Sequence, residues 1–295
     1  MKRHPVLLGL IIVGVILAVF LVSLITITHL TGRSAAFTPG DRIAVINVQG
    51  IIRDSKNVID QLLQFKKDKR VKAVVLRIDS PGGSVGPSQE IYEEIKKFRA
   101  KKKIVVSMGS IAASGGYYIA CAADRIVANP GTITGSIGVI VEFANLEELM
   151  KKIGFESVVI KSGKHKDVMS PFRSITPDER KLLQGVIDNV HNQFVEAIAQ
   201  ERKIKKDKVS QISDGRIFSG EQAKELGLID TLGNLQDAIS LAAAIGGVKG
   251  EPKIVYPPKK RFSIFDYIFR NIAQSIIDII GVESYHFSYL FIPNR

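Results

Sequence analysis

The fold is decided by one stretch of the sequence, residues 71–116, which reads VKAVVLRIDSPGGSVGPSQEIYEEIKKFRAKKKIVVSMGSIAASGG. Its first eight residues are rich in β-branched side chains and predict a buried strand, and IVVSM (104–108) predicts another. Between them, Gln89 to Phe98 places apolar residues at helical spacing among Glu and Lys. Strands joined through a helix imply a mainly parallel sheet, so the sequence predicts an α/β fold.

The flanking sequence extends this pattern in both directions. Ile43 to Val48 reads as a further strand, and Asn57 to Phe65 shows helical spacing. Thr176 to Lys203 is expected to hold a pair of helices, opened by a threonine cap with proline at the first helical position. Ser219 to Leu226 predicts another helix, which Gly227 ends.

The amino-terminal end carries a long uncharged segment. Residues 6–28 contain no charge and are dominated by Val, Leu and Ile, and a helix of this length spans the roughly 30 Å core of a bilayer. We expect a transmembrane anchor. A buried core helix would be shorter or would show a polar stripe, and a cleaved signal peptide needs a shorter apolar region, although Ser34-Ala35-Ala36 resembles a cleavage site.

The charges beside the predicted span indicate how it is oriented in the membrane. Lys2 and Arg3 precede the span, which favours an amino terminus on the cytoplasmic side and a body outside the cytoplasm. The predicted organisation is a cytoplasmic tail (1–5), the anchor (6–28), a linker (29–42), the main domain (43–250), a second linker (251–261) and a carboxy-terminal amphipathic segment (262–295).

The carboxy-terminal segment has an apolar stripe at near-helical spacing between residues 262 and 280. Asp266, Arg270 and Asp278 interrupt the stripe, so it does not predict a second membrane span. Three placements remain open: on the membrane surface, against a partner subunit, or folded back onto the main domain.

Composition excludes several classes of protein. The chain has 295 residues, a net charge of +12 and one cysteine, which rules out an internal disulfide and a cysteine-rich zinc site. Its basic residues are dispersed and no reading motif accompanies them, so we expect no nucleic-acid partner. The glycine-punctuated GTITGSIG (131–138) lacks the lysine of a phosphate loop, and no metal-ligand spacing is present. We therefore expect neither a cofactor nor a metal.

Two glycine-rich turns could hold an acyl-transfer site. Ser114 lies in ASGGYY where a strand passes to a helix, and Gly115 after it leaves its backbone N–H open to a carbonyl oxygen. The Gly82-Gly83 pair of DSPGGS follows a strand of the same sheet and can supply a second N–H donor. The alternative is that both are ordinary tight turns.

The base is harder to assign from the residues. His191 falls in a solvated helical pattern and His286 lies in the tail, so both fit structural or surface roles. His165 is adjacent to Lys166 in SGKHKDVMSPFR (162–173). Burial among apolar groups lowers the pKa of a lysine, and a neutral lysine can replace histidine as a base. A Ser–Lys dyad is therefore open.

Three segments follow one another behind the predicted anchor: DSPGGS, MGSIAASGGYYIACAADRIVANPGTITGSIGVI and SGKHKDVMSPFR. In this order they resemble signal peptide peptidase A of the short, single-unit bacterial type. The resemblance covers about residues 44 to 245. It implies a crotonase/Clp-protease-like fold of repeated ββα units with an amino-terminal transmembrane helix. By position, it assigns Ser114 as nucleophile, Lys166 as general base, Ser136 as the residue that orients the lysine, and Gly83 and Gly115 as oxyanion donors.

The same resemblance implies a serine endopeptidase that degrades remnant signal peptides and other apolar peptides at the outer face of the cytoplasmic membrane. It implies contact with membrane lipid and a ring-shaped homo-oligomer, in which neighbouring subunits help to complete each site. The competing readings are a related membrane Ser–Lys peptidase that cleaves other membrane-protein segments, a crotonase-type acyl-CoA enzyme, and a catalytically silent scaffold.

Overall fold

The computed structural model describes residues 14–20, 22–23, 40–258 and 288–290. The chain divides into two units, Met1–Gly40 and Asp41–Arg295. In the first unit, residues 14–20 and 22–23 are helical and exposed. Most of the predicted span over residues 6–28 lies outside the described residues, and the described part contains no helix that combines the length and apolarity needed to cross a membrane.

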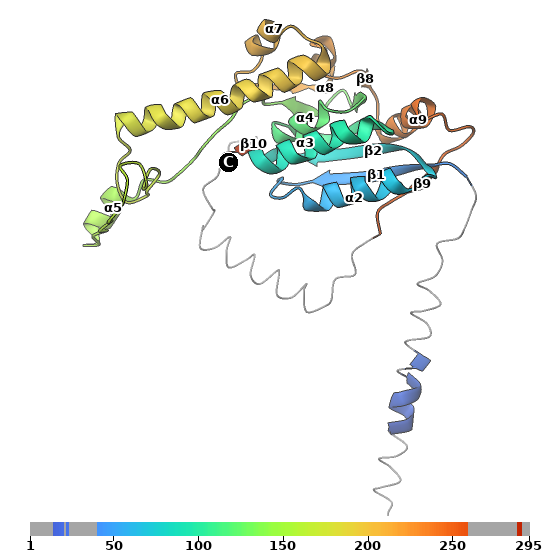
Figure 1. Ribbon diagram of the computed structural model, residues 1–295, viewed down its shortest axis with the longest axis horizontal. Coiled ribbons are helices and arrows are strands. Elements are labelled where there is room, and N and C mark those ends of the chain that lie inside the picture. Colours follow the sequence, from blue (N-terminus) through green and yellow to red (C-terminus); the bar gives the residue numbers. More distant parts are fainter. Residues whose placement is uncertain (1–13, 21, 24–39, 259–287, 291–295) are drawn as a thin grey trace, which may run out of the picture. The chain divides into compact units, whose positions relative to one another are not determined.

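The second unit is built on a mainly parallel sheet, as the sequence predicts. Three long parallel strands form its centre, in the order β1, β2, β4. Figure 1 shows β1 and β2 side by side. Among the described strands of this sheet, only the pair β6 and β7 is antiparallel. The strands are β1 (Arg42–Gln49), β2 (Val71–Ser80), β4 (Lys103–Ala113), β5 (Arg125–Ala128), β6 (Ile133–Gly135), β7 (Ile217–Ser219), β8 (Thr231–Leu232) and β9 (Lys253–Val255).

Both faces of the central strands are buried, because successive side chains of a strand point to opposite sides. Ile43 and Val45 of β1 pack with α9 (Leu235–Ile245) on one face. Ala44 and Ile46 belong to the larger core on the other face. The helices that cover this face are α2 (Lys56–Lys67), α3 (Val85–Arg99), α4 (Gly115–Ala120) and α6 (Pro177–Arg202). A sheet covered on both faces reads as a continuous apolar run, which explains the VKAVVLRI signal.

The described helices are α2 (Lys56–Lys67), α3 (Val85–Arg99), α4 (Gly115–Ala120), α5 (Glu147–Lys152), α6 (Pro177–Arg202), α7 (Lys206–Gln211), α8 (Gly220–Glu225) and α9. The helices predicted at 57–65, 89–98 and 219–226 are present, whereas α5, α7 and α9 were not predicted. The predicted helix pair over 176–203 is wrong, because α6 is one continuous helix of 26 residues. Its only proline is at the first turn, and Thr176 and Glu179 form a capping box there. A single internal glycine, Gly185, is tolerated in a helix of this length.

The predicted turn DSPGGS contains a short strand, β3 (Gly82–Ser84), so β2, β3 and α3 form one ββα unit. β3 pairs antiparallel with β10 (Ser288–Leu290), with Tyr289 opposite Gly83. β10 belongs to the predicted amphipathic segment 262–295, whose other residues lie outside the described ones. Within the predicted linker 251–261, β9 pairs with β1 and forms the edge of the sheet.

Candidate active site

Ser114 occupies a strained position at the point where β4 passes to α4. Its backbone has φ 52° and ψ −117°, a region that residues with a side chain rarely adopt, and its side chain is 1% exposed. The amide of Ser114 donates to the carbonyl of Gly135 at 2.8 Å, and its carbonyl accepts from the amide of Tyr118. Such a residue is held in place by the structure around it, and strain of this kind gathers at functional sites.

Ser136 follows β6 and lies close to Ser114 in the same cavity wall. It also has a positive φ, 48°, and its amide donates to the carbonyl of Arg216 at 2.8 Å. Gly135 must be glycine here, because it has φ 78° and a Cβ would lie 2.5 Å from the ring of Phe218. The structure therefore brings together two of the predicted site residues, Ser114 and Ser136.

The two glycine-rich turns meet beside Ser114. A Cβ on Gly115 would lie 3.2 Å from the amide nitrogen of Gly83, and a Cβ on Gly82 would lie 2.7 Å from the amide nitrogen of Gly115. Backbone thus approaches backbone at a distance that only glycine allows. The structure places Gly83 and Gly115, the predicted oxyanion donors, side by side.

The amide of Gly83 faces the edge of β3 that lies away from Ile52. Ile52 bonds the two residues that flank Gly83. Its carbonyl accepts from the amide of Ser84, and its amide donates to the carbonyl of Gly82, both at 2.8 Å. Because backbone groups alternate in direction along a strand, the groups of Gly83 point to the opposite edge. That edge is occupied by β10, and so it accepts an extended chain.

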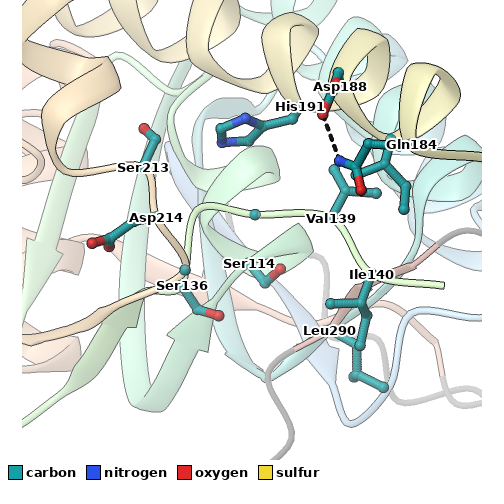
Figure 2. Close-up of a pocket in the computed structure, with 13 residues that line it drawn as sticks. Ser114, Ser136, Val139, Ile140, Gln184, Asp188, His191, Ser213, Asp214 and Leu290 are labelled. Atoms are coloured by element: carbon teal, nitrogen blue, oxygen red, sulfur yellow. Dashed lines mark hydrogen bonds between the residues drawn. The ribbon is translucent and has the colours of Figure 1, made fainter. Parts of the chain in front are cut away.

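A cavity of about 520 Å³ opens above Ser114. Figure 2 shows Ser114 and Ser136 on one side of it, with His191 and Asp188 of α6 on the other. The wall is mixed, with apolar side chains and two carboxylates. Its residues are Ser114, Ser136, Gly138, Val139, Ile140, Gln184, Ile187, Asp188, His191, Ser213, Asp214, Gly215 and Leu290.

The cavity wall contains residues that the sequence reasoning did not select. His191 was expected on a solvated helix face, yet it lines the cavity, and its buried Nε2 has no hydrogen-bond partner within the described ranges. Gln184, Ile187, Asp188 and His191 follow the i, i+3, i+4, i+7 spacing of one helix face. This spacing was a usable signal, but nothing in the sequence says which element α6 faces.

The wall contains two acidic side chains, Asp188 and Asp214. Asp214 pairs with Arg216, whose guanidinium lowers the pKa of that carboxyl to about 2, so it is ionised at neutral pH. Asp188 accepts a hydrogen bond from Gln184 at 2.7 Å (Figure 2). Among the described residues that line the cavity, none is a lysine or an arginine.

Lys166 lies outside this wall. It is exposed and lies in a turn between α5 and α6. In the same turn, Lys164 forms an ion pair with Asp178 at 2.9 Å. Across the ranges that the structure describes, Lys166 makes no side-chain hydrogen bond and does not line the cavity of its own chain. The predicted contact between Lys166 and Ser114 therefore stays a prediction.

Comparison with known proteins identifies the family. The profile of peptidase family S49 matches residues 96–249, and the profile of Clp protease matches residues 40–131. A protein of Synechocystis sp. that is named as a proposed protease is 47% identical over 70% of this chain and 75% of its own length. A second, from Methanocaldococcus jannaschii and also named as a proposed protease, is 31% identical over 96% of this chain and 97% of its own.

A third relative, from Enterococcus faecium, is named as a proposed signal peptide peptidase and is 36% identical over 67% of this chain and 62% of its own length. The resemblance drawn from the three sequence segments is confirmed, and the fold is a Clp-protease-like α/β fold with a mixed sheet. The chain belongs to peptidase family S49 and is a serine peptidase similar to signal peptide peptidase A.

Proposed function

We propose that this chain is a membrane-anchored serine endopeptidase in which Ser114 is the nucleophile and Lys166 the general base. Its substrates are remnant signal peptides at the outer face of the cytoplasmic membrane. The observation that carries the proposal is the meeting of the two glycine turns beside a buried serine in a strained backbone conformation. This is the local arrangement that attack on a carbonyl group needs.

The proposed chemistry has two halves. The neutral amine of Lys166 takes the proton of Ser114 as Oγ attacks the scissile carbonyl, and the amides of Gly83 and Gly115 stabilise the tetrahedral oxyanion. The lysine then gives this proton to the leaving amine, and an acyl-enzyme remains on Ser114. A water molecule repeats the sequence and releases the second product. Ser136 holds the lysine amine in position.

We propose that Lys166 serves the Ser114 of a neighbouring subunit in a ring. Two observations support this. Lys166 is exposed and outside the cavity wall of its own described chain, and the preceding segment exposes large apolar side chains, with Phe155 50%, Val158 80% and Ile160 97% exposed. Contiguous exposed apolar residues mark interaction surfaces. A second copy that covers them would bring Lys166 to a cavity whose described wall holds no lysine or arginine of its own.

The substrate class follows from the groove. The edge of β3 accepts an extended chain, as its pairing with β10 illustrates, and Val139 and Ile140 make the nearby wall apolar. Strand addition gives affinity through the backbone while shallow apolar pockets give broad specificity. A signal-peptide remnant would supply an extended backbone for the β3 edge and apolar side chains for these pockets. The uncharged segment 6–28 would hold the enzyme at the membrane where such remnants are left.

The proposal is tested by mixing two inactive variants of the full-length chain. Ser114→Ala and Lys166→Ala should each lose activity on an apolar peptide by roughly 10⁴-fold or more, because members of a catalytic unit fail together. A co-assembled mixture should regain activity, since some sites then combine an intact Ser114 with an intact Lys166 from a neighbour. His165→Ala, beside the lysine, is the matched control and should stay active.

The outcomes separate the competing functions. Full activity of Lys166→Ala would remove the dyad, and no recovery on mixing would assign both residues to one chain. Labelling with a fluorophosphonate should modify Ser114, whereas an inert serine in an assembled ring would favour a scaffold. Equal cleavage of a signal peptide and of an unrelated membrane-protein segment would widen the substrate class and leave the chemistry unchanged.

A further inference from the structure

Arg173 joins two carboxylates on either side of the Lys166 turn. Its Nε donates to Asp167 Oδ2 and its Nη2 to Asp167 Oδ1, both at 2.9 Å. On the other side, Nη1 donates to Glu179 Oε2 at 2.9 Å and Nη2 to Glu179 Oε1 at 2.6 Å. One guanidinium therefore makes a two-bond fork with each acid. Only arginine has the planar donor set for two such forks.

We call this group the Arg173 clamp (Arg173, Asp167 and Glu179). Its two carboxylates are shielded from solvent, while the side chain of Arg173 is 30% exposed. The side chain of Glu179 is 3% exposed and that of Asp167 is 13% exposed. Hydrogen bonds from Arg173 lower the pKa of Asp167 well below its ordinary range, and that of Glu179 to about 2, so both acids are charged at neutral pH. A shielded pair with good fork geometry is held far more firmly than an exposed surface ion pair.

The clamp connects the Lys166 turn to the helix that lines the cavity. Asp167 is next to Lys166 in a compact turn, where the amide of Lys166 donates to the carbonyl of Gly163 at 3.1 Å. Glu179 is in the first turn of α6, and later turns of the same helix carry Asp188 and His191 into the cavity wall. The position of the lysine is thus set relative to α6, which is a rigid element.

We propose that Arg173 is a positioning residue for the peptidase reaction: it fixes the turn that presents Lys166 so that the amine reaches Ser114 with the correct geometry. This rests on the proposed function, in which Lys166 is the base. Arg173 touches neither substrate nor the reacting atoms. Its effect on the rate is through the placement of the lysine, whether Lys166 serves its own chain or a neighbour.

The test compares Arg173→Lys with a matched control in the full-length protein. The side chain substituted at position 173 keeps the positive charge but cannot form either two-bond fork. Misplacing a catalytic group by about 1 Å costs on the order of 10²-fold in rate, so kcat should fall by that order while KM stays within about twofold. Lys164→Gln is the control, because it breaks the exposed Lys164–Asp178 pair on the same turn and leaves the clamp intact. It should keep wild-type kcat.

A second variant and a second readout keep structural damage apart from positioning. Asp167→Asn removes the charge facing Arg173, and with it the charge facing Lys161, whose Nζ donates to Asp167 Oδ1 at 2.5 Å. It preserves the Arg173–Glu179 fork, so the start of α6 is unchanged and the protein should still assemble. It should lower kcat in the same way. The rate of fluorophosphonate labelling of Ser114, measured against pH, should fall in both variants and lose its alkaline rise, whereas a purely structural role would shift only the thermal midpoint.

The results distinguish the two proposals. Suppose that Arg173→Lys and Asp167→Asn assemble and keep wild-type kcat and labelling, while Lys166→Ala is inactive. This result would overturn the role of Arg173 and leave the dyad standing. An active Lys166→Ala would overturn the dyad itself. Activity loss in Arg173→Lys with an equal loss in Lys164→Gln would also contradict the inference, because it would reflect general damage to the turn.

Discussion

The amide of Ser114 donates to the carbonyl of Gly135 at 2.8 Å, and this bond ties Ser114 to the segment that carries Ser136. Gly135 cannot be replaced without a clash with Phe218. The relative position of the two serines is therefore fixed by backbone, before any side chain or partner contributes. A site that is preorganised in this way stabilises a transition state without reorganising during the reaction.

Closing the space between the two glycine turns should remove an oxyanion donor. In Gly115→Ala the new methyl group would lie 3.2 Å from the amide nitrogen of Gly83 and 2.8 Å from Ser88 Oγ. We expect kcat/KM to fall about 10²-fold, the usual cost of one lost donor. Adding Ser88→Ala removes the side-chain contact and should not restore activity. Gly86→Ala, whose Cβ meets nothing within 4 Å, is the control. Rescue by Ser88→Ala would contradict the explanation.

The strain at Ser114 should be measurable as stability. Ser114→Gly relieves the positive φ of 52°, so we expect the free energy of unfolding to exceed that of Ser114→Ala by about 1–2 kcal/mol, with both variants inactive. Lys203→Gly, at φ 55° at the end of α6, should also be stabilising but should keep full activity. Denaturant unfolding measures the difference. Equal stability of the two Ser114 variants would show that the conformation is not strained.

The Arg173 clamp should weaken in acid. The pKa of Glu179 is lowered from 4.5 to about 2, chiefly by its hydrogen bonds with Arg173, so its folded-state pKa lies below the unfolded one. The stabilising contribution is complete above about pH 4.5 and is lost as the pH falls toward 2. We expect the thermal midpoint to drop across this range, and the drop to be smaller in Glu179→Gln. Identical profiles for the two proteins would argue against the assignment.

Activity should rise with pH on the alkaline side of neutrality, because in the proposed dyad only a neutral Lys166 amine accepts the proton of Ser114. The measurement is kcat/KM on an apolar peptide between pH 6 and pH 10, with circular dichroism to check the fold. A lysine that acts as the base gives a rising limb. A rate that falls steadily above neutrality, in protein that remains folded, would remove the proposed base.

Loosening β10 from the edge of β3 should favour the binding of an added peptide substrate. Tyr289 is fully buried, with its ring 5.2 Å from that of Tyr118 and 4.8 Å from that of Phe194, and it holds β10 against β3. A tethered strand competes at an effective concentration near millimolar. In Tyr289→Ala we expect KM for an added peptide to fall by roughly tenfold, since this competitor is loosened. Tyr256→Ala, at an exposed tyrosine, should leave KM unchanged. An unchanged KM in Tyr289→Ala would mean that β10 does not occupy the substrate edge.

Much of the fold follows from the sequence, since the apolar runs at 43–48, 71–78 and 104–108 become the central strands. The two glycine turns were also expected to cooperate, because both follow strands of one parallel sheet. The role of β10 could not be foreseen. β3 and β10 have three residues each, too few for a periodic signal, and about 200 positions separate them in the chain. The polar face of α6 looked solvated because only tertiary contacts reveal that it borders a cavity.

The position of Lys166 outside the described cavity wall of its own chain has a consequence for how the enzyme would be controlled. Under the shared-site proposal, a newly made single chain holds a nucleophile and its oxyanion donors but lacks a proton acceptor. Such a chain is a dormant precursor that needs no inhibitory peptide. Turnover would then increase more steeply than in proportion to protein concentration, and dilution below the point of ring dissociation would silence the enzyme without unfolding it.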